Sequence, residues 1–193
     1  MTSSTNIASW HLLPTTANIR GNKSAAITGK YSEVVKVILE QTYAPYGASS
    51  FEKTAETVRL NLDIACSESH NKFFNEVDAW VVAQMENDPQ SYFKKKMSKS
   101  EILAIFKPSC TPHSKDGVDY APTARTKINT AGPKMVQCWS VDKNARPPPS
   151  DYRNCKLTVE VTVRGIWFMS GQCGVTYEAQ NIIVEEHDHE CPF

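Results

Sequence analysis

Basic and aromatic side chains alternate through the middle of this 193-residue chain. Together the two types suit single-stranded nucleic acid, because cationic side chains hold phosphates and aromatic faces stack on bases, each worth about 1–3 kcal/mol. Trp167 and Phe168 are adjacent in a predicted strand, so we expect only one of them to face a groove, and half or more of the aromatics could be core. The candidate nucleic-acid-binding residues are Lys94, Lys95, Lys96, Lys107, Tyr120, Arg125, Lys127, Lys134, Trp139, Arg153, Trp167 and Phe168.

The formal net charge is zero, but the charges are segregated along the chain. Residues 1–93 carry 7 basic and 10 acidic side chains, and residues 165–193 carry 5 acidic and no basic ones. Residues 94–164 carry 14 basic and 6 acidic side chains, an excess of eight positive charges. Such a block is the electrostatic signature of a face that binds a polyanion. The alternative is that these lysines are spread over the surface as solvated charges.

The last nine residues form an acidic segment that ends in an aromatic residue, and we expect it to be a solvated, flexible tail. It could insert its terminal ring and carboxylate into a partner protein, or lie in the chain's own cationic groove. The alternative is a frayed terminus without a function. The candidate partner-binding residues are Glu185, Glu186, Asp188, Glu190 and Phe193.

Sequence motifs of catalysis are missing from the chain. It has no G-x-S-x-G, P-loop, G-x-G-x-x-G or H-E-x-x-H pattern. Asp116, Asp119, Asp142 and Asp151 are scattered, whereas a two-metal nuclease needs clustered carboxylates. We therefore expect no enzyme and no cofactor.

A metal site is also disfavoured. Cys110 with His113 is one possible ligand pair, and His187, His189 and Cys191 are another set, but structural zinc usually needs two pairs at defined spacing. None of the six cysteines forms a C-x-x-C pair, and the start of the chain has no recognisable signal peptide. We expect free thiols in a reducing intracellular compartment. No apolar stretch reaches membrane-spanning length.

The hydrophobic pattern predicts strands over residues 33–39, 57–65, 156–165 and 173–185. An amphipathic pattern predicts a helix over residues 70–87, and a capping box at Ser98 and Glu101 predicts a short helix from Lys99 to Phe106. Residues 107–124 contain three prolines and a glycine and are predicted to be a long irregular loop. Without a βαβ alternation, this order predicts a mainly β fold, an antiparallel barrel with helical additions.

The C-terminal half also resembles a known family. Residues 121–129, 138–142, 156–163 and 164–177 are similar to the OB-fold single-stranded-DNA-binding proteins of large eukaryotic DNA viruses. The most specific element is Gly165-x-Trp167 followed, after six residues, by Gly174-Val175-Thr176. The acidic tail with its terminal Phe resembles that of podovirus phage single-stranded-DNA-binding proteins. The likeness covers about residues 90–184 and the tail.

This resemblance implies an OB-like, five-stranded Greek-key barrel with a loop-rich binding face. We predict one such domain over residues 1–184, with an irregular N-terminal extension, and the tail over 185–193. The expected function is non-sequence-specific binding of single-stranded DNA, RNA being possible, in viral DNA replication and recombination. The tail would recruit replication proteins, or it would lie in the chain's own groove and inhibit DNA binding. We expect no membrane partner, a possible homodimer, and a location in a host nucleus or a cytoplasmic viral replication site.

Two other functions stay open from the sequence. One is a metal-dependent nucleic-acid enzyme or annealing factor whose carboxylates meet only in the fold. The other is a protein-interaction module that uses the basic face.

Overall fold

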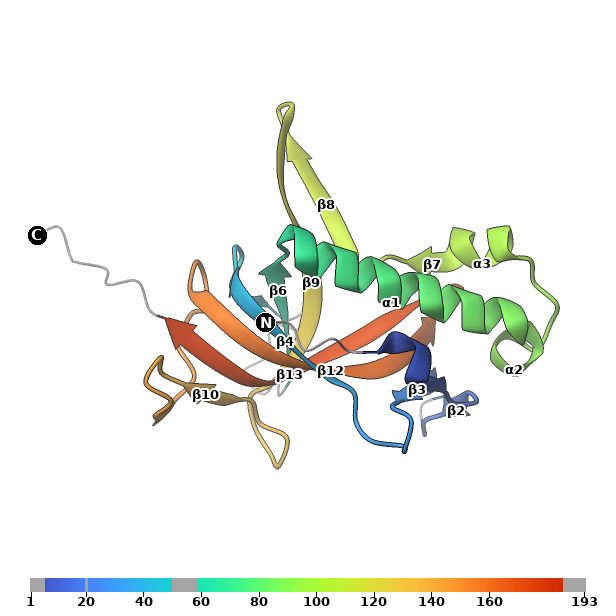
Figure 1. Cartoon of the computed structure of the whole chain (residues 1–193), viewed down its shortest axis with the longest axis horizontal. Helices are drawn as coiled ribbons and strands as arrows, with labels where there is room; N and C mark the ends of the chain where they lie inside the picture. Colours follow the sequence, from blue (N-terminus) through green and yellow to red (C-terminus); the bar gives the residue numbers. More distant parts are fainter. Residues whose placement is uncertain (1–5, 20, 50–58, 186–193) are drawn as a thin grey trace, which may run out of the picture.

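The computed structural model of the chain describes residues 6–19, 21–49 and 59–185. These residues form a mainly β fold in which three helices accompany one sheet of 13 strands, which confirms the expected fold class (Figure 1). In chain order the elements are η1 Ile7–Ser9, β1 His11–Leu12, β2 Thr16–Ala17, β3 Lys23–Thr28, β4 Lys36–Tyr43, β5 Ala48–Ser49, β6 Arg59–Ala65, α1 Glu68–Asn87, α2 Pro89–Phe93, α3 Lys99–Ile105, β7 Phe106–Lys107, β8 Cys110–Lys115, β9 Val118–Asn129, β10 Gln137–Trp139, β11 Ala145–Arg146, β12 Lys156–Met169 and β13 Gln172–Glu185.

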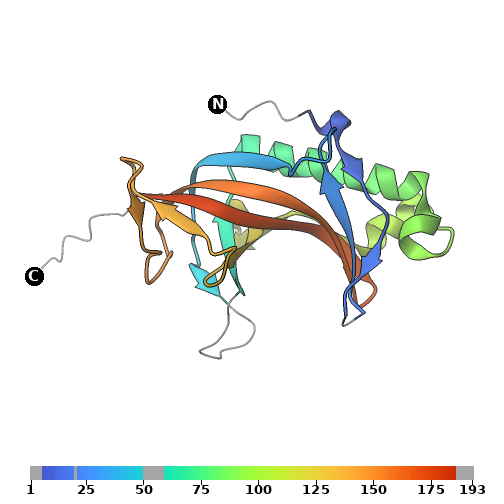
Figure 2. The same cartoon turned by 90° about the horizontal axis from the view of Figure 1, so that it is seen from below.

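Five of the strands form a partly open barrel. They lie side by side in the order β4-β12-β13-β9-β6. The two end strands of this series come together where the Thr42 hydroxyl of β4 donates a hydrogen bond to the Ala65 carbonyl of β6. Long strands must coil to do this, and Figure 2 shows β12 and β13 strongly curved. The architecture is the OB-like barrel that was expected.

The pairing of strands is mostly antiparallel, with one feature that the sequence did not predict. β13 runs antiparallel to β12 but parallel to β9, β7 and β10. Parallel neighbours need a long crossover between them. Here β10, β11 and β12 provide it between β9 and β13. The last strand, β13, thereby comes to lie beside β9, which carries Arg125 and Lys127.

The core lies between the barrel and α1. The predicted inward side chains of β12 are all buried: Leu157, Val159, Val161 and Val163. Thr162 was expected on the outer face but is buried as well, because the pairing of β12 with β13 shifts register on either side of it. From α1 the Phe74 ring packs edge-on against the Tyr177 ring, with their centroids 4.9 Å apart. Two further edge-on pairs involve α1: Phe73 with Phe74 at 5.4 Å, and Trp10 with Trp80 at 5.8 Å. Burying a ring of this size stabilises the fold by about 1.5–3 kcal/mol.

Capping side chains define the helix starts. Ser67 accepts a hydrogen bond from the His70 backbone amide, so α1 begins two residues earlier than predicted. The predicted capping box at Ser98 and Glu101 is present and opens α3. None of the described helices is both long and apolar enough to span a membrane.

Residues 107–124 are not an irregular loop, and that prediction was wrong. They contain the end of β7, all of β8 and the first part of β9, and β8 and β9 form a hairpin. Asp116 and Gly117 make the turn with φ of 53° and 78°, values that the Asp-Gly pair adopts readily. The prolines concealed this signal, yet Pro112 and Pro122 both lie where the β8–β9 pairing shifts register.

Two other predicted strands are displaced. The strand expected over residues 33–39 is β4, which begins at Lys36 and continues to Tyr43. The strand expected over residues 57–65 is β6 from Arg59 onward, and its first two positions lie outside the described residues.

Candidate nucleic-acid interface

A groove of about 570 Å³ opens where β6 and β9 approach β12 and β13. Its basic side chains come from four strands far apart in the sequence: Lys23, Arg59, Lys107, Arg125 and Lys127. One carboxylate, Asp63, lines it too. Five positive charges against one negative leave an excess of four, so the groove attracts anions.

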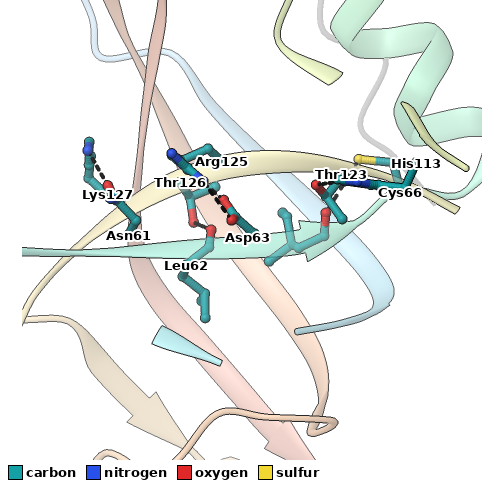
Figure 3. Close-up of polar contacts among 10 residues, drawn as sticks. Asn61, Leu62, Asp63, Cys66, His113, Thr123, Arg125, Thr126 and Lys127 are labelled. Carbon is teal, nitrogen blue, oxygen red and sulfur yellow. Dashed lines mark hydrogen bonds and ion pairs between the residues drawn. The ribbon is translucent and has the colours of Figure 1, made fainter. Parts of the chain in front are cut away.

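Strand alternation directs these side chains into the groove. In β9, Thr123, Arg125 and Lys127 line the groove, while the intervening residues are buried. The antiparallel register sets Asp63 of β6 opposite Arg125 and Asn61 opposite Lys127. Figure 3 shows these pairs lined up along the two strands. Both basic side chains of β9 therefore have a polar partner directly across from them on β6.

Arg125 and Asp63 form a two-point ion pair. The Arg125 Nε lies 2.7 Å from Asp63 Oδ1 and its Nη2 lies 2.8 Å from Oδ2. The hydrogen bond and charge of Asp63 raise the pKa of Arg125. Because Arg125 is half-exposed, the pair contributes only about 0–1 kcal/mol to stability. Its main consequences are that Arg125 is held in place and that its charge is offset.

Lys127 is a half-buried cation of the groove. Its Nζ donates a hydrogen bond to the Asn61 side-chain carbonyl. Partial burial lowers its pKa, the charges of Arg59 and Arg125 lower it further, and Asp63 acts in the opposite direction. Cations crowded in this way repel one another, and a bound anion would relieve that repulsion.

The buried carboxylate of Glu178 binds two more cations, Arg59 and Arg164. The Arg164 Nη2 lies 2.9 Å from Glu178 Oε1, and the Arg59 Nη2 lies 3.6 Å from Oε2. Burial raises the pKa of Glu178, but the hydrogen bonds and charge of Arg164, together with the charges of Arg59 and Lys134, hold it below its ordinary value. Glu178 is therefore ionised, and it anchors Arg59 at the end of the groove.

Trp167 and Phe168 form the aromatic side of the groove, and both are partly exposed. Trp167 lies over Gly174, where a Cβ atom would come within 2.9 Å of the indole. Phe168 also packs edge-on against Phe93 at a centroid distance of 5.8 Å. Both residues line the groove, as does Met169 at the hairpin end of β12, and the expectation that only one of the two rings faces the groove stays a prediction.

The glycine pattern of the sequence has a structural basis in this hairpin. Gly165 has φ of 145°, and a Cβ atom there would lie 2.1 Å from the Ala25 carbonyl oxygen of β3. Gly165 thus permits the close approach of β3, and Gly174 permits that of the Trp167 ring. Both residues determine where the aromatic side of the groove lies.

A buried polar network forms part of the groove wall. The Ser109 amide lies 2.7 Å from Asp78 Oδ2, its hydroxyl lies 2.5 Å from Oδ1, and the hydroxyls of Ser109 and Tyr177 are 2.9 Å apart. Burial raises the pKa of Asp78 to about 6, although the Ser109 hydrogen bonds oppose this. Burial also raises the pKa of Tyr177. Tyr177 is a structural residue here, since its ring is buried against α1.

The groove brings together five of the twelve predicted nucleic-acid-binding residues: Lys107, Arg125, Lys127, Trp167 and Phe168. The structure places the others elsewhere. Lys94, Lys95 and Lys96 are exposed after α2, and Lys134 is exposed after β9. Arg153 pairs with Asp151 at 3.8 Å. Tyr120 lies on the β8–β9 hairpin.

Trp139 belongs to a different surface. Its Nε1 donates a 3.1 Å hydrogen bond to Asn181, and it lines a hollow of about 330 Å³ with Lys143 and Glu160. The neighbouring hollow of about 780 Å³ contains Lys156 and Glu185 as its charged residues. Each of these hollows has balanced charges, so neither has the cationic character of the groove.

Sequence reasoning missed Lys23 and Arg59. Both belong to the N-terminal half, whose net charge is negative, so charge segregation pointed away from them. Arg59 had a usable signal, because it alternates with the apolar side chains of a predicted strand. Lys23 had none, since only the pairing of β3 with β12 brings it to the groove.

The predicted tail residues fall at the edge of the described chain. Glu185 is the last residue of β13, and its Oε1 lies 3.7 Å from the Lys156 Nζ. Glu186, Asp188, Glu190 and Phe193 lie outside the described residues.

The candidate metal ligands Cys110 and His113 point to different partners. The Cys110 Sγ lies 3.5 Å from Cys66 Sγ, and His113 Nε2 lies 2.7 Å from the Thr123 hydroxyl. Across residues 6–19, 21–49 and 59–185, no three His, Cys, Asp or Glu side chains are grouped as a metal site requires.

Comparison with known proteins gives distant structural similarity only. No protein family matches the sequence, and no curated protein is similar to it. The single-stranded DNA-binding protein from bacteriophage Enc34 in complex with ssDNA is similar with a TM-score of 0.48 and 10% identity, over 92% of this chain and 97% of that one. Its C-terminal truncation gives 0.47 and 6%, over 92% and 95%. Both are bacteriophage proteins, and neither comes from a large eukaryotic DNA virus.

Proposed function

We propose that this chain binds single-stranded DNA without sequence preference, and without catalysis, in the groove between β6, β9, β12 and β13. The observation that carries the proposal is the excess of four positive charges beside two partly exposed aromatic rings. Basic side chains along β9 would track phosphates while Trp167 and Phe168 stack on bases. Base faces are accessible in this way only in a single strand.

The state of Lys127 supports an anionic ligand. Its pKa is lowered by burial and by two neighbouring cations, so a phosphate in the groove would favour its charged form. Arg125 is already oriented by Asp63 and needs no reordering to meet a second oxygen acceptor. A cationic groove prepared in this way is suited to phosphate backbones.

Fluorescence anisotropy of a labelled poly-dT oligonucleotide across a salt series tests the proposal. We expect salt-sensitive binding that unlabelled duplex DNA fails to compete, and a poly-U competitor measures the preference between DNA and RNA. Lys127→Met should weaken binding, whereas Lys99→Met, a lysine on α3 outside the groove, should not. Absence of binding at low salt contradicts the proposal and would favour a protein partner for the basic face.

We further propose a role in viral DNA replication and recombination, in which the acidic tail competes with DNA for the groove or recruits replication proteins. The support is the charge complementarity between four carboxylates after Val184 and the cationic groove. Deleting residues 185–193 should tighten DNA binding at low salt and weaken capture of partners. Unchanged affinity for both would refute the role of the tail.

A reducing intracellular compartment, such as a host nucleus or a cytoplasmic replication site, is proposed as the place of action. The support is that Cys66, Cys110, Cys138 and Cys173 are buried free thiols. Thiol titration of the protein purified without reductant tests this, and four or more reactive thiols after unfolding are expected.

A further inference from the structure

The hairpin of β8 and the first part of β9 projects beyond the barrel (Figure 1). Thr111 and His113 of β8 and Thr123 of β9 line the groove at the base of the hairpin. Its tip is the turn at Asp116 and Gly117. The hairpin thus begins at the groove wall and leads away from it.

A register shift in this hairpin changes which side chains face the groove. Thr111 pairs with Thr123, but His113 pairs with Tyr120, so two residues of β8 span three of β9. The extra residue reverses the alternation of β9, as a β-bulge does. Without it, Tyr120 would point away from the face that carries Arg125 and Thr123. With it, Tyr120 shares that face, because residues directly opposite across a strand pair lie on the same side.

His113 connects the groove to an aromatic surface on this face. Its Nε2 lies 2.7 Å from the Thr123 hydroxyl, in line with Arg125 and Lys127 (Figure 3). The Tyr46 ring stands edge-on to the His113 ring at a centroid distance of 5.9 Å. Tyr46 is 56% exposed and Tyr120 is 55% exposed, so neither ring serves the core.

Charge continues along the same face. Lys115 lies two residues beyond His113 on β8, so it also points to this side. At about 3.3 Å per residue, Tyr120 lies roughly 13 Å along the strands from Arg125. Stacked bases are spaced by about 3.4 Å, so this distance exceeds the length of one nucleotide. The face has room for nucleotides beyond those in the groove.

We propose that the β8–β9 hairpin is an arm that extends the DNA-binding track, with Tyr120, His113 and Tyr46 as a second stacking surface. This inference rests on the proposed function and adds to it the path of the bound strand over the protein. Aromatic faces accept any base, and a flanking lysine holds the backbone, which is the combination found in the groove itself. A single strand in the groove would leave it along Lys127, Arg125 and His113 toward Tyr120.

The test compares two oligonucleotide lengths, about dT6 to fill the groove and about dT20 to reach the arm as well. For the wild type we expect the longer strand to bind more tightly than the shorter one. The gain in affinity should exceed the statistical factor that comes from the larger number of binding positions on the longer strand. Tyr120→Ala should weaken binding of the longer strand about tenfold and leave the shorter one unchanged. Tyr120→Phe should restore most of the loss. Tyr31→Ala removes a tyrosine that is 81% exposed and does not line the groove, so it is the matched control.

The outcomes separate this inference from the function on which it rests. Failure of the wild type to bind either length would overturn the proposed function. Normal binding of both lengths by Tyr120→Ala would overturn the arm alone. An equal loss on both lengths would also overturn it, because the arm would then act through the shape of the groove. Circular dichroism of each variant checks that the fold is kept.

Discussion

The charge excess of the groove predicts how strongly salt weakens DNA binding, and two substitutions should change that dependence in opposite directions. For single strands the slope of log affinity against log salt is about −0.7 for each phosphate neutralised. Asp63 offsets Arg125, which leaves an excess of four charges and an expected slope of about −2.8. Between about 50 and 200 mM salt, wild-type affinity should therefore fall about 50-fold.

Asp63→Asn removes the offsetting charge and frees Arg125 for a phosphate. The slope should steepen to about −3.5, and the loss of affinity over the same salt range should grow to about 130-fold. Lys127→Met removes a cation, so the slope should flatten to about −2.1 and the loss should shrink to about 20-fold. Asn keeps one acceptor for the Arg125 Nε, so the side chain stays oriented.

Anisotropy titrations at five salt concentrations measure the three slopes. Glu86→Gln is the matched control, since it removes one carboxylate from an ion pair with Lys99 on the helices, away from the groove. Its slope should equal that of the wild type. The reasoning is refuted when all four proteins give one slope, or when Asp63→Asn flattens it. The second result would mean that Asp63 is needed to position Arg125.

Three further predictions concern the groove wall and its aromatic side. The pKa of Asp78 is about 6 in the folded protein and 3.8 ordinarily, so folding favours the neutral acid. The stability that the neutral Asp78 contributes is therefore complete below about pH 4 and is lost as the pH rises through about 6. Urea unfolding should show a loss of about 3 kcal/mol over this window that Asp78→Asn abolishes, and an unchanged pH dependence in the variant would refute the assignment. Gly165→Ala should lower the free energy of unfolding by about 3 kcal/mol, since the new Cβ would lie 2.1 Å from a backbone carbonyl oxygen of β3. Gly171→Ala, with open space around it, should lower it by only about 1 kcal/mol. Equal shifts of the melting temperature in the two variants would contradict this. Trp167→Ala should weaken poly-dT binding at least fivefold, a loss of about 1 kcal/mol or more, while Trp139→Ala should not, and the reverse order in anisotropy would place the stacking surface elsewhere.

Local patterns determined most elements of the fold. The alternation in residues 156–165 and 173–185 predicted β12 and β13, because each strand has one face in the core and the period of two is written directly in the residue types. The capping box at Ser98 predicted the start of α3 for a similarly local reason. The hairpin at Asp116 and Gly117 was also encoded locally, but the surrounding prolines led to the prediction of a loop.

The sequence by itself determined that this chain has a basic block, aromatic residues interspersed in it, and strands that alternate between core and surface. Only the tertiary structure decided which of these side chains share a groove. Arg59 and Lys23 join Lys127 because β6 and β3 pair with β9 and β12, while Trp139 is carried to another face by β10. Strand pairing between distant segments depends on how the whole barrel closes, and no local spacing records it.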